Sequence, residues 1–202
     1  MRLLILALTV CVASLAAPPV FGGNQQYEPL AASTQAGLRA SIADQPAPRH
    51  GFSDSIAAVN WLTEMSRRLD LRMPRFEARL DLLRTIHYEA TRAGLDPQLI
   101  LAIVQVESGF RKYAVSSAGA RGFMQVMPFW IGLIGRGEDN LFGLRTNLRY
   151  GCVILRHYLD IERGDLFRAL GRYNGSLGKP EYPNMVMAAM RTSWHWKDPT
   201  RQ

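Results

Sequence analysis

The segment Asp-Pro-Gln-Leu-Ile-Leu-Ala-Ile-Val-Gln-Val-Glu-Ser, residues 96–108, decides the fold of this chain. Asp96 followed by Pro97 is typical of a helix start, because the aspartate can cap the helix and proline fits its first position. From Leu99 to Val106, apolar residues occur on nearly every side of the predicted helix. A helix that is apolar all round belongs in the middle of a domain. We therefore expect residues 97–108 to form a central, buried helix.

Helical patterns continue on both sides of this segment. Upstream, Ser53 can cap a helix over about residues 54–70, and Pro74 starts a second helix that runs to about Ala93 and can end at Gly94. Downstream, we expect helices over about residues 123–133, 146–162, 165–174 and 183–192. No convincing strand run and no internal repeat is found. The sequence thus predicts a mostly α domain over residues 51–202, which includes a helical extension at its N-terminal end.

The first fifty residues differ from the rest in composition. Residues 1–16 are typical of a signal peptide, with Arg2 before an apolar stretch and a small-x-small cleavage site that ends at Ala16. A lipoprotein signal acylated at Cys11 is the alternative, but the preceding valine is larger than that signal favours. Residues 17–50 are rich in Ala, Pro, Gln, Ser and Gly without an apolar period, which predicts a flexible linker. We therefore expect an exported, periplasmic protein.

Charge and composition limit which molecules the protein is expected to bind. The net charge of +7 suits an anionic wall polymer or membrane surface, although charge alone also serves solubility. The four histidines show no metal-ligand spacing and no Gly-rich phosphate loop follows a strand, so we expect no metal, no cofactor and no nucleic acid. Cys152 lies in an apolar helical run, which indicates a buried structural thiol. We expect a monomer, and leave open whether it assembles with other cell-envelope proteins.

Glu107 is the strongest candidate for a catalytic residue. It lies at the C-terminal end of the predicted central helix, and no other acidic residue occurs between Asp96 and Glu138. The helix C-terminus carries partial negative charge, and apolar neighbours disfavour ionisation. Both effects raise the pKa of a carboxyl group, as a general acid near neutral pH requires. The alternative is a surface glutamate where the helix frays.

Motifs downstream of Glu107 carry a family resemblance. Glu107-Ser108-Gly109-Phe110 is followed by Gly122-Phe123-Met124-Gln125 and later by Arg172-Tyr173-Asn174-Gly175, while Asn147 stands four residues before Gly151. In this order and spacing they closely resemble the soluble lytic transglycosylase family (SLT, family 1), over about residues 80–190. Each motif alone is weak, whereas three in register on an exported chain form a strong signal. The resemblance implies a lysozyme-like α fold and cleavage of the glycan strands of bacterial peptidoglycan.

The resemblance also implies substrate-binding roles for five residues, which are Ser108, Met124, Gln125, Tyr173 and Asn174. Ser108 and Gln125 would hydrogen-bond the bound sugar, and Tyr173 would orient Glu107 or the substrate. Asn174 would help to hold that corner of the cleft. Simpler roles remain open, because serine, tyrosine and asparagine also occur at helix ends and methionine most often fills a core.

Two further features have alternatives. Arg172 replaces a small residue of the family pattern, and it could contact an anionic peptide stem if it faces the cleft. The tail Trp194-His195-Trp196 is interpreted as a packing or docking element, with an extra sugar-stacking surface as the alternative.

The resemblance implies chemistry with a single carboxylate, although most glycosidases use two. Glu107 would protonate the oxygen between N-acetylmuramic acid and N-acetylglucosamine. It would then deprotonate the C6 hydroxyl, which closes a 1,6-anhydro ring. Two alternatives stay open: a lysozyme-type hydrolase on the same fold, which a second carboxylate across the cleft would favour, and a non-catalytic peptidoglycan-binding or secretion-assembly module. The sequence does not distinguish exo from endo cleavage.

Overall fold

The computed structural model describes residues 25–43 and 55–197 of the chain. The predicted signal peptide 1–16, the alternative acylation site Cys11 and the predicted helix cap Ser53 lie outside these residues.

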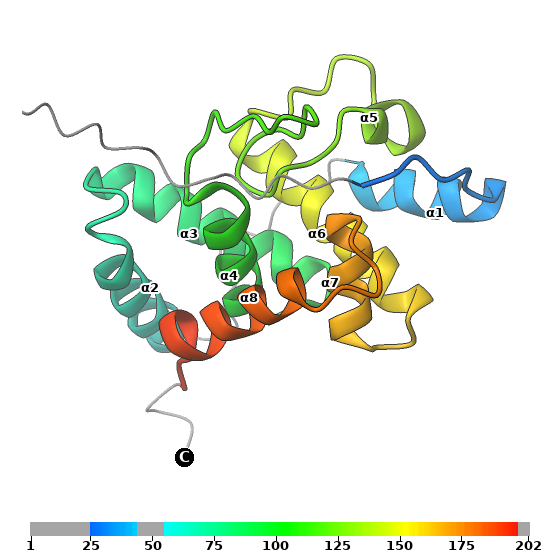
Figure 1. Cartoon of the computed structure of the whole chain (residues 1–202). Coiled ribbons are helices and arrows are strands. Elements are labelled where there is room, and N and C mark those ends of the chain that lie inside the picture. The colour runs from blue at the N-terminus through cyan, green and yellow to red at the C-terminus, as the bar shows by residue number, and fades with distance from the viewer. Residues whose placement is uncertain (1–24, 44–54, 198–202) are drawn as a thin grey trace, which may run out of the picture.

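The described residues form eight α-helices and one π-helical turn, and no β-strand (Figure 1). In chain order these are α1 (Ala32–Ile42), α2 (Ser55–Leu69), α3 (Phe76–Arg92), α4 (Pro97–Ser108), α5 (Phe129–Ile134), α6 (Leu144–Ile161), α7 (Leu166–Asn174), α8 (Glu181–Ala189) and the π turn η1 (Met190–Trp194). No helix within these ranges is long and apolar enough to cross a membrane. The mostly α class is confirmed, and it agrees with the lysozyme-like domain that the resemblance implies.

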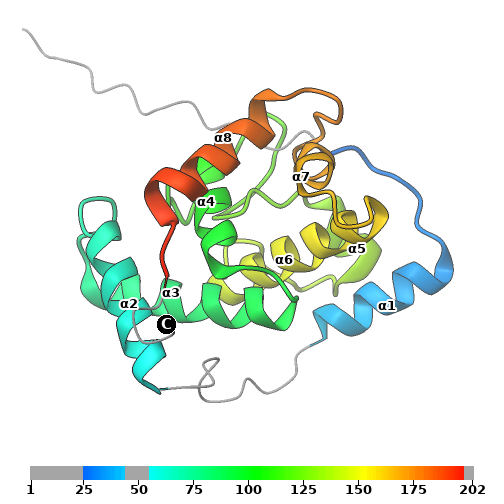
Figure 2. The ribbon, with the colours of Figure 1, turned by 90° about the horizontal axis from the view of Figure 1, so that it is seen from below.

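Helix α4 lies at the centre of the fold, where it packs against α3, α8 and η1 (Figure 2). The five residues from Ile100 to Val104 have no exposed surface. The side chain of Asp96 accepts a hydrogen bond from the backbone N–H of Gln98 at 2.8 Å, and Gly109 ends the helix with a left-handed φ of 57°. The predicted boundaries and burial of this helix are therefore confirmed.

Helices α2 and α3 confirm the two upstream predictions, although their apolar residues are only partly buried. Met65 and Leu69 of α2 are fully buried, whereas Ile56 and Val59, in its first turns, are more than half exposed. Phe76, at the start of α3, is also exposed. The first turns of both helices project beyond the core. Apolar residues at helical spacing are therefore not all buried.

The predicted helix over residues 123–133 is wrong in its first half. Residues 109–128 form a loop with two isolated β-bridges, which pair Arg121 with Val115 and with Val126. The two backbone hydrogen bonds between Arg121 and Val126 are both 3.0 Å long. Helix α5 therefore begins only at Phe129, after Pro128. A helix over these residues would need their backbone N–H and C=O groups for its own hydrogen bonds. In the structure these groups bond within the loop, through the bridges, and to side chains of neighbouring helices.

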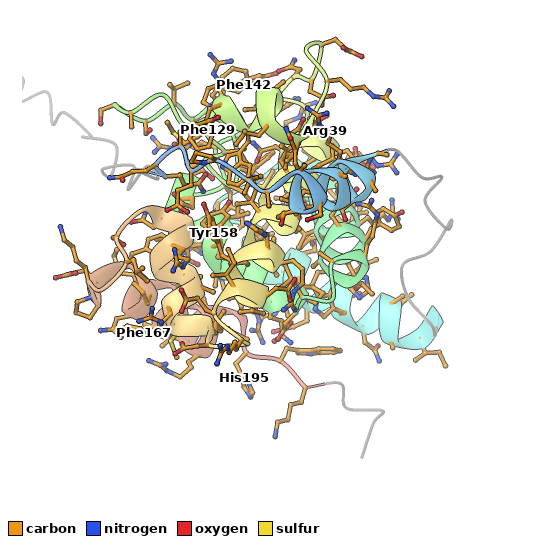
Figure 3. All side chains as sticks on the ribbon, turned by 90° about the vertical axis from the view of Figure 1, so that its right-hand side faces the viewer. Arg39, Phe129, Phe142, Tyr158, Phe167 and His195 are labelled. Atoms are coloured by element: carbon orange, nitrogen blue, oxygen red, sulfur yellow. The ribbon has the colours of Figure 1, made fainter. Side chains whose placement is uncertain are left out.

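The prediction of a flexible linker over residues 17–50 is wrong for residues 25–43. Helix α1 packs against α5 and α6, and Gln35 and Arg39 both donate to the carbonyl of Leu133, at 2.7 and 3.2 Å. Figure 3 shows Phe129 of α5 beside the extended segment that leads into α1. Ahead of α1, the buried Gln25 accepts a 2.7 Å hydrogen bond from the indole N–H of Trp130. Burial of Ile42 in the core adds to these polar contacts, although the segment shows no sustained apolar period in the sequence.

Candidate active site

Glu107 occupies the last turn of α4 and has no exposed surface. The hydroxyl of Tyr182 donates a hydrogen bond of 2.6 Å to its Oε1 atom. Within the part of the chain that the structure describes, its buried Oε2 atom has no hydrogen-bond partner. The carboxyl group is thus held by one oxygen, and the other remains available for chemistry. The alternative of a surface glutamate at a frayed helix end is excluded.

Burial raises the pKa of Glu107 from 4.5 to about 8, and the hydrogen bond from Tyr182 opposes this rise only in part. The charged form loses its hydration in the interior, which is the usual reason for such a rise. The predicted direction is confirmed. Neither cause of the change involves a second carboxylate. At neutral pH the group is therefore mostly protonated and can serve as a proton donor.

Tyr182 is a site residue that the sequence reasoning missed. It lies in the first turn of α8, 75 residues away from Glu107 along the chain. Burial and the nearby charge of Glu107 raise the pKa of Tyr182, so its hydroxyl stays protonated as a donor. No spacing rule connects these two residues, because only the packing of α8 against α4 brings them together.

Tyr173 holds the loop over residues 109–128 rather than an oxygen of Glu107. Its hydroxyl, fully buried at the end of α7, donates to the backbone carbonyl of Met124 at 2.8 Å. Burial raises the pKa of Tyr173, and the charge of Glu107 is the next largest cause, which places the two side chains within electrostatic reach. Tyr173 thereby joins the loop to the neighbourhood of Glu107.

Asn147 of α6 holds the same loop from the opposite side. Its Oδ1 atom accepts from the backbone N–H of Met124 at 2.8 Å. Its Nδ2 atom donates to the carbonyls of Arg121 and Leu141, both at 2.8 Å. A Cβ atom on Gly122 would lie 2.4 Å from that nitrogen, so only glycine fits beside it. All polar groups of this buried amide are therefore used to fix the loop.

The spacing of Asn147 and Gly151 also has a structural reason. One helical turn after Asn147, Gly151 faces the side chain of Met124, and a Cβ atom there would meet its Sδ atom at 2.3 Å. Met124 itself has no exposed surface. The structure thus places Met124 in the core between α6 and the loop, which is the simpler of the two roles considered for it.

Gln125 is fully buried and has a left-handed backbone, with φ of 49°. Its Nε2 atom donates to the carbonyls of Ala114 and Gly122, at 3.1 and 2.8 Å. These two bonds fix which end of the amide is the oxygen. The Oε1 atom, also buried, has no partner among the described residues. Gln125 therefore has a fixed acceptor atom, and its sugar-binding role stays a prediction.

Ser108 and Asn174 are less clearly directed to a substrate. The hydroxyl of Ser108 donates to the carbonyl of Val104 at 3.0 Å, one turn back in α4. Asn174 is the last residue of α7, and its side chain makes no hydrogen bond within the described ranges. Both positions match the helix-end alternative, and sugar contacts by these residues remain predictions.

Other residues considered from the sequence have structural partners. Arg172 pairs with Glu162, so its side chain is held by that carboxylate. Trp194 has no exposed surface, donates to Gln105 Oε1 at 3.0 Å and stacks edge-on with Phe110 at 5.6 Å between ring centroids. Packing is thereby confirmed for Trp194, and sugar stacking on it is excluded. Cys152 is buried, as predicted, and burial raises the pKa of its thiol.

The structure is thus a mostly α domain with a buried carboxyl group of raised pKa at the end of its central helix, which agrees with a lysozyme-like fold. In the described ranges, no three His, Cys, Asp or Glu side chains are grouped so that they could hold a metal ion. The carboxyl group of Glu107, with its raised pKa, is the group that the site offers for acid–base chemistry.

Comparison with known proteins agrees with the family resemblance. Residues 84–183 match the family described as "Transglycosylase SLT domain". A "Transglycosylase" of Enterobacteria phage PRD1 is 33% identical over 110 residues, which cover 51% of this chain and 40% of the relative. A "Membrane-bound lytic murein transglycosylase C" of Haemophilus influenzae is 50% identical over 112 residues, 48% of this chain and 31% of the relative. The chain therefore spans less than half the length of these relatives.

Proposed function

We propose that this chain is a peptidoglycan lytic transglycosylase. It cleaves the β1,4 bond between N-acetylmuramic acid and N-acetylglucosamine and leaves a 1,6-anhydro ring on the muramic acid. The observation that carries the proposal is the state of Glu107, which is buried, has a pKa of about 8 and is bonded through one oxygen only. The SLT domain over residues 84–183 supports the choice of reaction.

The hydrogen bond from Tyr182 determines which oxygen of Glu107 acts. Because the Tyr182 hydroxyl donates to Oε1, that atom is an acceptor, and the acid proton of the protonated carboxyl group resides on Oε2. Oε2 donates this proton to the bridging oxygen as the glycosidic bond breaks. The Tyr182 hydrogen bond then stabilises the carboxylate that remains.

The same carboxylate completes the reaction as a base. It takes the proton of the C6 hydroxyl, whose oxygen attacks the anomeric carbon and closes the anhydro ring. This hydroxyl belongs to the sugar that reacts, so it is held beside the anomeric carbon without the entropic cost of capturing a separate molecule. In this proposal one ionisable residue serves both steps.

The loop over residues 109–128 supplies the wall of the site. Met124 is held at its N–H by Asn147 and at its carbonyl by Tyr173, and Gln125 follows directly. The Gln125 Oε1 atom is positioned to accept a hydrogen bond from a sugar hydroxyl or from an N-acetyl N–H group. Since Glu107 has no exposed surface, a glycan strand must displace what covers Oε2 as it binds.

The place of action follows from the substrate. The polymer lies in the bacterial envelope, and the segment 1–16 has the pattern of an export signal. We propose that the chain acts there, on glycan strands in the periplasm, as a monomer or together with envelope proteins.

The test is turnover by the Glu107→Gln variant on purified peptidoglycan. The amide is nearly isosteric, yet it can neither donate nor accept the catalytic proton. General acid–base loss costs ~10²–10⁴-fold in rate, so release of soluble fragments should fall by at least that factor. Glu77→Gln, which removes an exposed carboxylate on α3, is the control and should retain activity. Retention of more than about a tenth of the wild-type rate by Glu107→Gln would contradict the assignment.

A further inference from the structure

A second surface lies on the loop over residues 109–128, outside the site around Glu107. It is formed by Lys112, Tyr113, Arg121 and Phe142, and we name it the aromatic–basic surface. Tyr113 is 71% exposed, in contrast to the other aromatic residues of the loop, Phe110 and Phe123, which are buried. Tyr113 therefore presents most of its side chain to solvent.

The two aromatic rings of this surface contact one another, and each ring also contacts a positively charged side chain. The ring centroids of Tyr113 and Phe142 are 5.9 Å apart. The Lys112 ammonium lies 5.2 Å from the centre of the Tyr113 ring, and the Arg121 guanidinium lies 5.8 Å from the centre of the Phe142 ring. Such cation–π contacts hold long, exposed side chains in place. The two positive charges are therefore kept at a defined surface.

The charges of this surface are not neutralised by the loop itself. Residues 108–137 contain four arginine or lysine residues and no aspartate or glutamate. Within the described ranges, neither Lys112 nor Arg121 forms an ion pair. The surface is thus complementary to an anion that also has apolar groups to place against the rings.

Hydrogen bonds to the backbone carbonyl of Ala114 connect this surface to Gln125. Ala114, the residue after Tyr113, accepts through its carbonyl from Gln125 Nε2 at 3.1 Å and from the N–H of Gly122 at 2.9 Å. The β-bridge between Val115 and Arg121 joins the two sides of the loop. The aromatic–basic surface is therefore fixed relative to the acceptor that we assign to the bound sugar.

We propose that the aromatic–basic surface binds the anionic peptide stem of a peptidoglycan strand while the strand lies at Glu107. This inference rests on the proposed function. The stems end in carboxylates and carry aliphatic side chains, which match the two cations and the two rings. A glycan without stems offers only the lactyl carboxylate of each muramic acid, with no aliphatic side chains to place against the rings, so it would gain less from this surface.

Binding to two forms of one polymer tests the proposal. One form is purified peptidoglycan with its stems, and the other is the same material after amidase removal of the stems. The Glu107→Gln background prevents turnover during co-sedimentation, and the double variant Lys112→Gln/Arg121→Gln is introduced into it. Lys197→Gln/Arg191→Gln is the matched control, because it removes one exposed lysine and one exposed arginine near His195, at the end of the molecule opposite Phe142 (Figure 3).

The double variant should bind the stem-bearing polymer about 5–30-fold more weakly, as expected for two exposed charge contacts. Because the amidase leaves a lactyl carboxylate on each muramic acid, the double variant should lose less affinity for the stem-free polymer than for the stem-bearing one, and the control should match the parent on both. Equal weakening on both polymers, or no weakening on either, would overturn the proposal. These outcomes are separate from failure of the proposed function, which would appear as wild-type protein that cleaves neither polymer.

Discussion

Replacement of Glu107 by glutamine should stabilise the folded chain, and increasingly so as pH rises. In the unfolded chain the carboxyl group titrates near its ordinary pKa of 4.5, whereas burial raises the folded-state pKa to about 8. The folded state therefore binds the proton more tightly. Wild-type stability should fall as pH rises from about 4.5, and should level off above about 8. Glutamine has no such titration.

The size of the effect follows from the two pKa values. A pKa difference of one corresponds to about 1.4 kcal/mol, so the gap between 4.5 and about 8 corresponds to roughly 5 kcal/mol in full. At pH 7, where the folded group is still mostly protonated, the expected gain of Glu107→Gln is roughly 3 kcal/mol. The amide keeps an acceptor for Tyr182, so that hydrogen bond is not lost.

The assay is urea unfolding of the wild type and of Glu107→Gln at about pH 5, 7 and 9, with the free energy of unfolding extrapolated to water. Glu77→Gln is again the control and should differ from wild type by no more than about 0.5 kcal/mol, as surface substitutions do. A stability gain that is the same at all three pH values would refute the argument. So would a variant less stable than wild type at alkaline pH.

Three further changes test other parts of the structure. Tyr182→Phe removes the hydrogen bond that lowers the pKa of Glu107, so the alkaline limb of the pH–kcat/KM profile should move to higher pH; an unmoved limb would contradict this contact. Gly151→Ala forces a Cβ against Met124 and should cost about 1–3 kcal/mol in thermal unfolding, whereas a neutral result would disprove the close approach. Removal of residues 1–43 takes away the docked helix α1 and should lower the melting temperature by several degrees; an unchanged value would show that α1 adds no stability.

The central helix and its glutamate could be predicted because their determinants are local. The cap Asp96, the apolar run after it and the lone acid at its end are contiguous, and burial of the run accounts for the raised pKa of Glu107. The order of the motifs was also informative, since Asn147 and Tyr173 both hold the backbone of Met124.

Features that depend on contacts distant in sequence could not be predicted in this way. Tyr182 reaches Glu107 through the packing of α8 on α4, and nothing near Tyr182 in the sequence indicates that contact. Helix α1 is held by side-chain hydrogen bonds to backbone carbonyls, such as those from Gln35 and Arg39 to Leu133, and by burial of Ile42 in the core. Composition therefore suggested a linker where the structure has a docked helix.

The chemistry assigned to Glu107 is tested most directly by the mass of the products from purified peptidoglycan. If the C6 hydroxyl attacks the anomeric carbon, the muramic acid ends are 1,6-anhydro sugars, each lighter by one water than a hydrolysed end, and no new reducing ends form. We expect chiefly such anhydro products from the wild type and none from Glu107→Gln. Hydrated, reducing muramic acid ends as the main product would contradict it, because they require attack by water and a residue to activate that water.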